Sequence, residues 1–161
     1  MLYWRQASPH GRVTVVVSDC GLRAIGLPND DLDELVVDAK QQRDLAIAKQ
    51  LDDLFAGRRH TVDVPLDLEG IDGFRRTVLE TLTREVPWGE TVSYGELAAM
   101  AGRPRAARAV GSAMRRNPLP FVIPCHRVLA AGNKIGGYGG GANAIDLKRE
   151  LLAREGVIVR R

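Results

Sequence analysis

Two stretches of the first 70 residues alternate apolar and polar positions, with valine or leucine at 13, 15 and 17 and again at 62, 64 and 66. Alternation with a period of two is typical of strands that bury one face. A further short strand is expected at 22–27, after a turn at Cys20 and Gly21. Because Cys20 follows a β-branched run, we interpret it as a small buried residue rather than a nucleophile. This part of the chain is therefore expected to form a small sheet.

Helical spacing replaces alternation between these strands and again after residue 73. Ile47, Leu51, Leu54 and Phe55 recur at the intervals of one helix face, and Gly57 follows as a cap. The segment 67–73 holds two glycines and three acids and is the best candidate for a domain boundary. We therefore predict an N-terminal domain over 1–70 and a C-terminal domain over 71–161.

The C-terminal half predicts three helices in succession before residue 117. Phe74, Val78 and Leu82 share a face of the first. Ser93 and Glu96 have the spacing of a capping box, which starts a helix over 94–101 that stops at a glycine. Pro104 is placed at the first turn of the next helix, which is expected to run to Arg116 before Asn-Pro ends it. Two helices joined by a tight glycine turn predict a helix-turn-helix.

Composition excludes several classes of protein. The chain has 161 residues, 45% of them hydrophobic, and two cysteines. The longest apolar runs are far shorter than the roughly 20 residues of a membrane helix, and residues 1–5 do not begin a signal peptide. We expect a cytoplasmic protein with no membrane association. Two cysteines without a Cys-x-x-Cys pair predict neither a disulfide scaffold nor a metal site, so cysteine chemistry would belong to one thiol.

Charge is distributed unevenly along the chain, whose formal net charge is +3. Residues 1–70 carry 8 basic and 12 acidic side chains, whereas residues 71–161 carry 15 and 8. The window 97–145 has seven basic side chains and no acidic one. A patch of one sign favours a polyanion as partner, although a solvated basic surface is the alternative.

The predicted helix that ends near residue 116 has two unlike faces. One stripe is apolar or small, with residues 107, 110, 111 and 114, and the other holds Arg105, Arg108, Ser112 and Arg115. Alanines at 106, 109 and 113 make the rest of the helix small, so its backbone can approach another surface closely. A solvated helix would carry longer polar residues and some acids. The pattern therefore favours nucleic acid as the partner.

The stretch around Cys125 contains the candidate chemistry. An apolar run over 121–123, between Pro120 and Pro124, predicts a buried extended segment that delivers Cys125 to its end. A thiol attacks as its thiolate, and the neighbouring His126 and Arg127 favour that form. The alternative is an inert half-buried cysteine beside a surface histidine. Its position just after a basic helix-turn-helix favours the reactive interpretation.

Two features follow the cysteine. Five glycines in residues 136–141 surround Tyr138, an arrangement that lets backbone amides and an aromatic ring approach a flat purine; a floppy loop is the alternative. No Gly-Lys-Ser/Thr follows, so this is not a phosphate loop. A last helix over 147–154 ends at Glu155, which is either solvated or turned inward to orient an imidazole.

Together these residues resemble the O6-alkylguanine-DNA alkyltransferases, also called methylated-DNA-protein-cysteine methyltransferases. The resemblance rests on Pro-Cys-His-Arg-Val at 124–128, Ser-Tyr at 93–94, Ala-Ala-Arg-Ala-Val-Gly at 106–111 and Asn-Pro at 117–118. It is close over 74–156 and only general over 1–70. It implies a ribonuclease-H-like α/β N-terminal domain and a mostly α C-terminal domain with a winged-helix-like helix-turn-helix.

The resemblance also implies an activity without a metal or cofactor. The alkyl group of O6-alkylguanine, and by the same chemistry of O4-alkylthymine, would pass once and irreversibly to Cys125 after the base is flipped from the minor groove. His126 matches the base that acts through a water, and Glu155 the carboxylate that orients it. Tyr94 resembles the tyrosine that rotates the nucleotide and protonates guanine, and Arg108 the arginine that fills the vacated stack.

Further positions match the family's substrate and DNA contacts. The substrate pocket would include residues that line or brace it: Met114, Asn117, Val128, Tyr138 and Gly139. The contacts to duplex DNA would come from Tyr94, Ala106 and three arginines: Arg105, Arg108 and Arg115. The implied partner is double-stranded DNA that contains O6-alkylguanine, bound by a monomer or by monomers clustered along the duplex.

The sequence departs from the family at a few positions, and two other functions are alternatives to it. Arg75 and Arg116 replace smaller or neutral residues and are candidates for phosphate contacts, and Gly139 replaces a serine of some relatives. A helix-turn-helix regulator would need base-reading Asn or Gln side chains, which the arginine stripe lacks. A cysteine hydrolase would turn over repeatedly. Relatives that bind alkylated DNA without repairing it lack the cysteine, which is present here.

Overall fold

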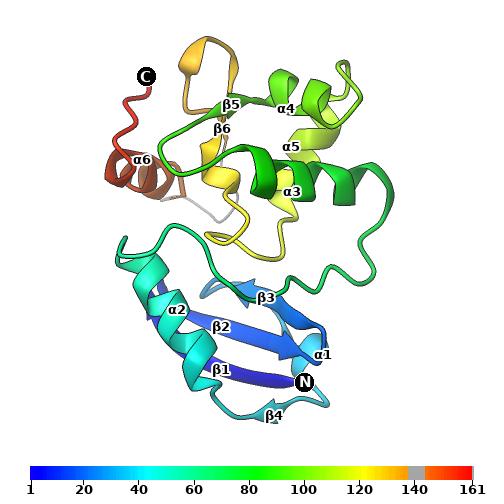
Figure 1. Ribbon diagram of the computed structural model, residues 1–161, viewed down its shortest axis with the longest axis vertical. Helices are drawn as coiled ribbons and strands as arrows, with labels where there is room; N and C mark the ends of the chain where they lie inside the picture. The colour runs from blue at the N-terminus through cyan, green and yellow to red at the C-terminus, as the bar shows by residue number, and fades with distance from the viewer. Residues whose placement is uncertain (138–143, 161) are drawn as a thin grey trace. The chain divides into compact units, whose positions relative to one another are not determined.

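A four-stranded sheet forms the frame of the first of two units into which the chain divides, Met1–Leu68 and Glu69–Arg161 (Figure 1). This computed structural model describes residues 1–137 and 144–160. The strands are β1 (Leu2–Ser8), β2 (Gly11–Ser18), β3 (Gly21–Gly26) and β4 (Lys40–Gln41), in the order β3-β2-β1-β4. The first three are antiparallel, and β4 pairs with β1 in parallel.

The sheet of this unit buries its apolar side chains beneath α2 (Leu45–Phe55). A short helix, α1 (Asp33–Val36), precedes β4. Asp44 caps α2, because its side chain accepts a hydrogen bond from the amide of Ile47, and Gly57 follows the helix with a φ of 74°. Buried Gln6 of β1 donates to the Ala48 carbonyl and to Asp52, so a polar side chain fastens α2 to the sheet.

Three expectations for this unit need correction. Strand β1 was missed, because buried Gln6 hides the alternation of that strand. Residues 62–66 form no strand but only an isolated bridge between Leu66 and Leu22. Cys20 is exposed rather than buried, since β2 ends at Ser18 and Cys20 lies in the turn that follows. The N-terminal strand is therefore an inner strand of the sheet, between β2 and β4, and the stretch at 62–66 adds no strand to it.

The second unit packs helices around a two-stranded parallel sheet. Helix α3 (Gly73–Glu85) leads to β5 (Val92–Ser93), α4 (Tyr94–Met100) and α5 (Ala107–Arg115). The chain then forms the 3-10 helix η1 (Cys125–Arg127), β6 (Val128–Leu129), the 3-10 helix η2 (Ala131–Asn133) and α6 (Ala144–Arg154). Helices α3, α4 and α5 pack on one another, and β5 pairs with β6.

Two features of the second unit differ from the sequence expectation. Helix α5 begins at Ala107, because Pro104 sits in a turn that the Ala106 amide closes on the Arg103 carbonyl. The apolar run at 121–123 is mostly buried as expected but it is not extended. Its backbone turns, with the Ile123 amide on the Leu119 carbonyl and Phe121 at a φ of 71°. Within the described ranges, no helix has the length and apolar content to cross a bilayer.

Candidate active site

Cys125 lies at the start of η1, where a braced turn presents it. Its side chain is 7% exposed, and its amide donates to the Ile123 carbonyl. The Asn117 side chain holds this turn at two points: Nδ2 donates to the Ile123 carbonyl at 2.8 Å, and Oδ1 accepts from the Leu119 amide at 2.9 Å. Asn117 therefore fixes the backbone that carries the cysteine and does not itself line the pocket.

Strand pairing brings Tyr94 close to Cys125. Ser93 of β5 pairs with Leu129 of β6, which starts directly after η1, so the first residue of α4 is held near the cysteine. The expected capping box is present: the Glu96 amide donates to the Ser93 hydroxyl at 3.0 Å, and the Ser93 amide donates to the Glu96 carboxylate at 3.2 Å. The cap sets where α4 begins and thereby the direction of the Tyr94 side chain.

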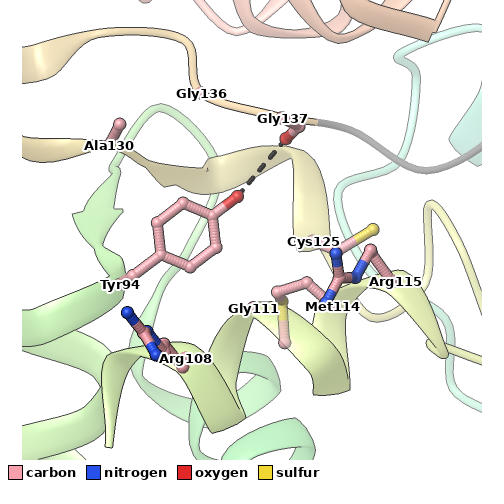
Figure 2. Close-up of a pocket in the computed structure, with 9 residues that line it drawn as sticks. All are labelled: Tyr94, Arg108, Gly111, Met114, Arg115, Cys125, Ala130, Gly136 and Gly137. Atoms are coloured by element: carbon pink, nitrogen blue, oxygen red, sulfur yellow. Dashed lines mark hydrogen bonds between the residues drawn. The ribbon is translucent and has the colours of Figure 1, made fainter.

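A pocket of about 520 Å³ opens in front of Cys125 (Figure 2). Its walls come from α4, α5, η1 and the backbone after β6, and they are formed by nine residues: Tyr94, Arg108, Gly111, Met114, Arg115, Cys125, Ala130, Gly136 and Gly137. Glycine is needed beside the tyrosine ring at position 136, where φ is 65° and space is tight, whereas position 111 has room for an ordinary contact. A Cβ at position 136 would lie 3.3 Å from Ala130 and 3.5 Å from the ring, and one at 111 would lie 4.0 Å from it.

Behind the cysteine, three charged or titratable side chains form a buried cluster, which we call the His126–Arg127–Glu155 cluster. The Glu155 carboxylate lies 2.8 Å from His126 Nε2 and accepts two hydrogen bonds from the Arg127 guanidinium, at 2.9 and 3.0 Å. Arg127 also donates to the Val86 carbonyl at 2.8 Å. The three side chains are at most 7% exposed, so water does not compete for these bonds.

The cluster determines the protonation of His126. Burial raises the pKa of Glu155, but hydrogen bonds from His126 and Arg127 outweigh burial and bring this pKa down to about 2. Burial lowers the pKa of His126 despite the hydrogen bond to Glu155, so the imidazole is neutral at pH 7. Because ionised Glu155 can only accept, Nε2 must carry the imidazole hydrogen. Nδ1 is then a bare acceptor, and it is buried without a hydrogen-bond partner among the described residues.

Tyr94 is held in the pocket as a neutral phenol. Its hydroxyl donates to the Gly137 carbonyl at 3.3 Å. Burial raises the pKa of Tyr94, and the nearby Cys125 raises it further, whereas Arg115 lowers it. The phenol therefore keeps its proton at neutral pH and can donate it to a group in the pocket.

The structure separates the sequence candidates by location. The pocket brings together Cys125, Tyr94, Met114, Arg108 and Arg115. Several other candidates do not line it: His126, Glu155 and Val128 are buried behind it, and Ala106 and Arg105 precede α5. Tyr138 and Gly139 lie outside the described residues.

Sequence reasoning missed one buried position next to the pocket and expected a different partner for another. Lys148 is fully buried, and its Nζ donates to the Val128 carbonyl at 2.6 Å and to the Gly137 carbonyl at 3.1 Å. Helical spacing places it on the same face as Ala144, Leu151 and Leu152, which was the available signal. Arg127, expected as a cationic neighbour of the thiol, is instead engaged by Glu155.

The second helix of the helix-turn-helix presents a basic surface. Arg108 and Arg115 of α5 are exposed, whereas Val110, Ala113 and Met114 are buried against the rest of the unit. A phosphate contact by Arg75 stays a prediction. One N–H group of its guanidinium donates to the Arg116 carbonyl at the end of α5.

A family model described as the 6-O-methylguanine DNA methyltransferase DNA-binding domain matches residues 73–157. A Cricetulus griseus relative named methylated-DNA--protein-cysteine methyltransferase is 55% identical over 89 residues, which cover 55% of this chain and 42% of the relative. A Methanosarcina acetivorans relative of the same name is 45% identical over 109 residues, which cover 68% of this chain and 67% of the relative. The match thus spans less than half of the first relative's length.

Solved structures extend the similarity over nearly the whole chain. The crystal structure of Mycobacterium tuberculosis OGT in complex with DNA is similar with a TM-score of 0.84 and 36% sequence identity. The similarity covers 96% of this chain and 92% of that one. Both units, with their small mixed sheet and their helices, therefore have counterparts in that fold.

Proposed function

We propose, because the chain belongs to the 6-O-methylguanine DNA methyltransferase family, that it repairs O6-alkylguanine in duplex DNA by taking the alkyl group onto Cys125. The observation that carries the proposal is the joint placement of three groups. A cysteine and a tyrosine face one pocket, and a neutral histidine oriented by a carboxylate lies behind the cysteine. Each group has a role in the transfer of an alkyl group from oxygen to sulfur.

In the proposed reaction, the thiol proton leaves first. His126 Nδ1, the bare acceptor of the imidazole, takes this proton through a water, and Glu155 stabilises the imidazolium that forms. Sγ then attacks the alkyl carbon, the bond from that carbon to O6 breaks, and the electron pair stays on guanine. Tyr94 donates its proton toward N3 of the leaving base.

The product explains why the protein would act once. The transfer forms a thioether on Cys125, and a thioether has no good leaving group. Cys20 is exposed in a turn of the other unit and does not line the pocket. We therefore propose a stoichiometric repair protein, with the same chemistry available to O4-alkylthymine.

The basic surface of α5 would dock on the DNA backbone. Arg105, Arg108 and Arg115 would make contacts that do not depend on sequence, while the small residue Ala106 allows close approach to the minor groove. Arg108 borders the pocket and would fill the stack that the flipped base leaves. Met114 lines the pocket. By the family resemblance, the backbone of Val128, which lies behind the pocket, and Tyr138 and Gly139, which lie outside the described residues, would also contact the flipped base.

The proposal includes finer assignments of fold, location and assembly. We assign the first unit to the ribonuclease-H-like class and the second to a winged helix-turn-helix. The sheet order β3-β2-β1-β4 and the adjacency of α4 and α5 support these assignments. We also place the protein in the cytoplasm. A monomer would suffice for the reaction, since the nine pocket residues come from one unit of one chain.

Intact mass measurement after incubation with O6-methylguanine DNA tests the function. We expect one methyl group per protein, located at Cys125 by peptide mapping, and no second turnover. Cys125→Ser should abolish transfer but keep DNA binding, and Cys20→Ser should change neither. A methyl group on Cys20 or repeated turnover would contradict the proposal, and turnover of an ester would favour a cysteine hydrolase.

A further inference from the structure

The proposed reaction leaves one buried charged residue without a role. Lys148 of α6 has no exposed surface and lies on the same face as Ala144 and Leu152. Lysine is rarely buried unless its ammonium group is well hydrogen-bonded, because transferring a charge out of water is costly. A fully buried lysine beside a reactive cysteine therefore requires a physical explanation.

The two carbonyls that Lys148 binds belong to different parts of the site. Val128 begins β6 immediately after η1, the turn that carries Cys125, and its carbonyl lies 2.6 Å from Nζ. Gly137 lines the pocket wall, and its carbonyl lies 3.1 Å from Nζ. Lys148 thus connects the backbone that follows the cysteine turn with the pocket wall at Gly137.

The same wall carbonyl also holds the tyrosine. Gly137 accepts hydrogen bonds from both the Tyr94 hydroxyl and Lys148 Nζ, and Nζ lies 6.0 Å from the centre of the Tyr94 ring. Figure 2 shows the Tyr94 hydroxyl pointing at this carbonyl. Any movement of the wall therefore changes where the phenol proton is held relative to Cys125.

The charge of Lys148 is coupled to two titratable groups of the site, Cys125 and His126. Burial lowers the pKa of Lys148 to about 8, and the Cys125 thiolate raises it. At pH 7 the side chain is therefore mainly an ammonium. Because electrostatic coupling is mutual, this ammonium favours the thiolate form of Cys125. Its charge also contributes to the lowered pKa of His126.

We propose that Lys148 is a positioning residue for alkyl transfer, which ties the Gly137 wall to the backbone of Cys125 and places a positive charge that favours the thiolate. The inference rests on the proposed role of Cys125 as alkyl acceptor. It assigns Lys148 two separable contributions, a hydrogen-bonded connection and a charge.

Two substitutions separate these contributions in a Cys20→Ser background, where Cys125 is the single thiol. Lys148→Met removes both the charge and the donors, while Lys148→Gln removes the charge and keeps an N–H donor. The exposed lysine of the same unit supplies the matched control, Lys134→Met. Far-UV circular dichroism and the unfolding midpoint establish that each variant is folded. If the Met variant does not fold, the Gln variant carries the test.

The first measurement is the pH dependence of Cys125 alkylation by iodoacetamide, followed by intact mass. This reaction needs no DNA and no guanine. Both Lys148 variants should raise the pH midpoint by about one unit, the size expected for loss of a nearby opposite charge. Lys134→Met should leave the midpoint unchanged. Repeating the series with His126→Gln removes any contribution from the imidazole.

The second measurement is the rate of transfer from free O6-benzylguanine and from O6-methylguanine DNA at pH 7. Free base is held by pocket contacts alone, so Lys148→Met should slow its transfer about tenfold or more, and more than it slows transfer from DNA. The transfer rate of the Lys148→Gln variant should lie between the rates of the Lys148→Met variant and the unsubstituted chain.

The two measurements distinguish the failure of each proposal. A folded Lys148→Met or Lys148→Gln variant with an unchanged thiol midpoint and unchanged transfer rates would overturn the role of Lys148. An unsubstituted chain that takes no methyl group from DNA would overturn the proposed function, whatever the iodoacetamide series shows.

Discussion

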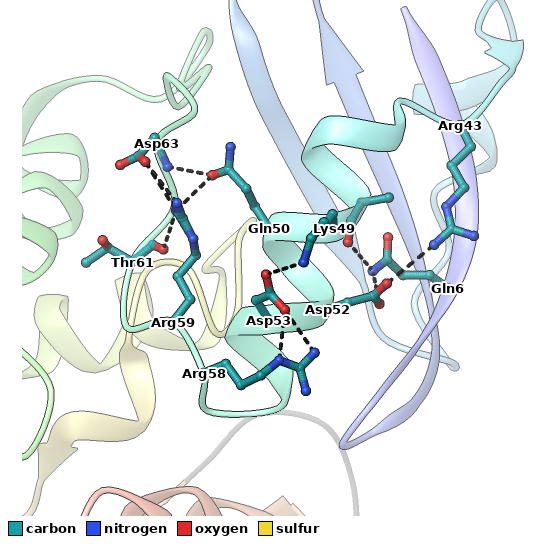
Figure 3. Close-up of polar contacts among 11 residues, drawn as sticks. Gln6, Arg43, Lys49, Gln50, Asp52, Asp53, Arg58, Arg59, Thr61 and Asp63 are labelled. Carbon is teal, nitrogen blue, oxygen red and sulfur yellow. Dashed lines mark hydrogen bonds and ion pairs between the residues drawn. The ribbon is translucent and has the colours of Figure 1, made fainter.

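The two units of the molecule use the same kinds of charged side chain in opposite environments. In the N-terminal unit, two separate groups of ion pairs lie on and just after α2: Lys49 and Arg58 pair with Asp53, and Arg59 pairs with Asp63 (Figure 3). In the C-terminal unit, the His126–Arg127–Glu155 cluster is buried. Ion-pair distances are close to 2.9 Å in both, yet Lys49 is 76% exposed and Arg127 is 7% exposed.

The comparison shows that the contribution of an ion pair to stability depends on its exposure to water rather than on the distance between its charged atoms. Exposed pairs contribute little because water and salt compete with them, whereas a buried pair interacts strongly and leaves an uncompensated charge if one partner is removed. Hydrogen bonds from Lys49 and Arg58 lower the pKa of Asp53, but Asp53 is not among the residues that line the pocket. The pKa of Glu155 decides which nitrogen of His126 can accept a proton.

Substitution of one carboxylate in each unit tests this difference most directly. Glu155→Gln should destabilise the fold by about 3 kcal/mol, because Arg127 would remain buried without its counter-ion, and should slow alkyl transfer as well. Asp53→Asn is the matched change at the surface and should leave the unfolding midpoint unchanged. Urea unfolding of both variants provides the measurement. Equal losses in the two would show that burial does not govern the contribution of these charges.

Acid should remove the contribution of Glu155 in a defined pH range. The pKa of Glu155 is lowered from its usual 4.5 to about 2, so its stabilising contribution is complete above pH 4.5 and is lost as the pH falls from 4.5 toward 2. The full contribution is about 3 kcal/mol. Urea unfolding at pH 7, 4.5 and 3 should show the gap between the unsubstituted chain and Glu155→Gln shrinking with acid. If the difference in unfolding free energy between the two proteins stayed constant with pH, ionisation of Glu155 would not be its source.

Substitution of Arg108 tests whether an exposed charge contributes to base flipping and not only to DNA binding. A guanidinium that fills the vacated stack stabilises the flipped state, so Arg108→Ala should slow repair of duplex DNA by about tenfold, which corresponds to about 1.4 kcal/mol. Transfer from free O6-benzylguanine should change little, because no base must be flipped. Single-turnover rates with both substrates decide the outcome. An equal loss on both would mean that Arg108 serves the pocket or the fold.

The smallest effect is expected for the exposed arginines that we propose as phosphate contacts. The double variant Arg115→Glu and Arg116→Glu should weaken binding to unrelated duplexes alike and lower the salt slope of binding by about two, or about one per lost contact. Arg58→Glu reverses an exposed charge of the N-terminal unit and is the control. Titrations at several salt concentrations measure the slope. A strong preference for one undamaged sequence at high salt would favour a regulator instead.

Local sequence patterns are sufficient wherever neighbouring residues set the structure. Helix α2 and its glycine cap, α3, and the capping box of Ser93 and Glu96 follow from spacing within one or two turns. The motif around Cys125 is equally clear in the sequence, because its chemistry lies in adjacent residues. The turn at 119–123 is not, since its conformation depends on the Asn117 side chain and on a positive φ at Phe121.

Residues close together along the chain specify the family and the basic helix pair α4 and α5, so the sequence was enough for both. The reactivity of Cys125 stays a prediction. The packed fold was needed to establish that Glu155 turns inward, that Arg127 serves that carboxylate and that Lys148 reaches the pocket wall. These contacts join residues that are 11 to 29 positions apart. Their strength comes from the exclusion of water around them, and burial is a property of the packed fold that no local pattern specifies.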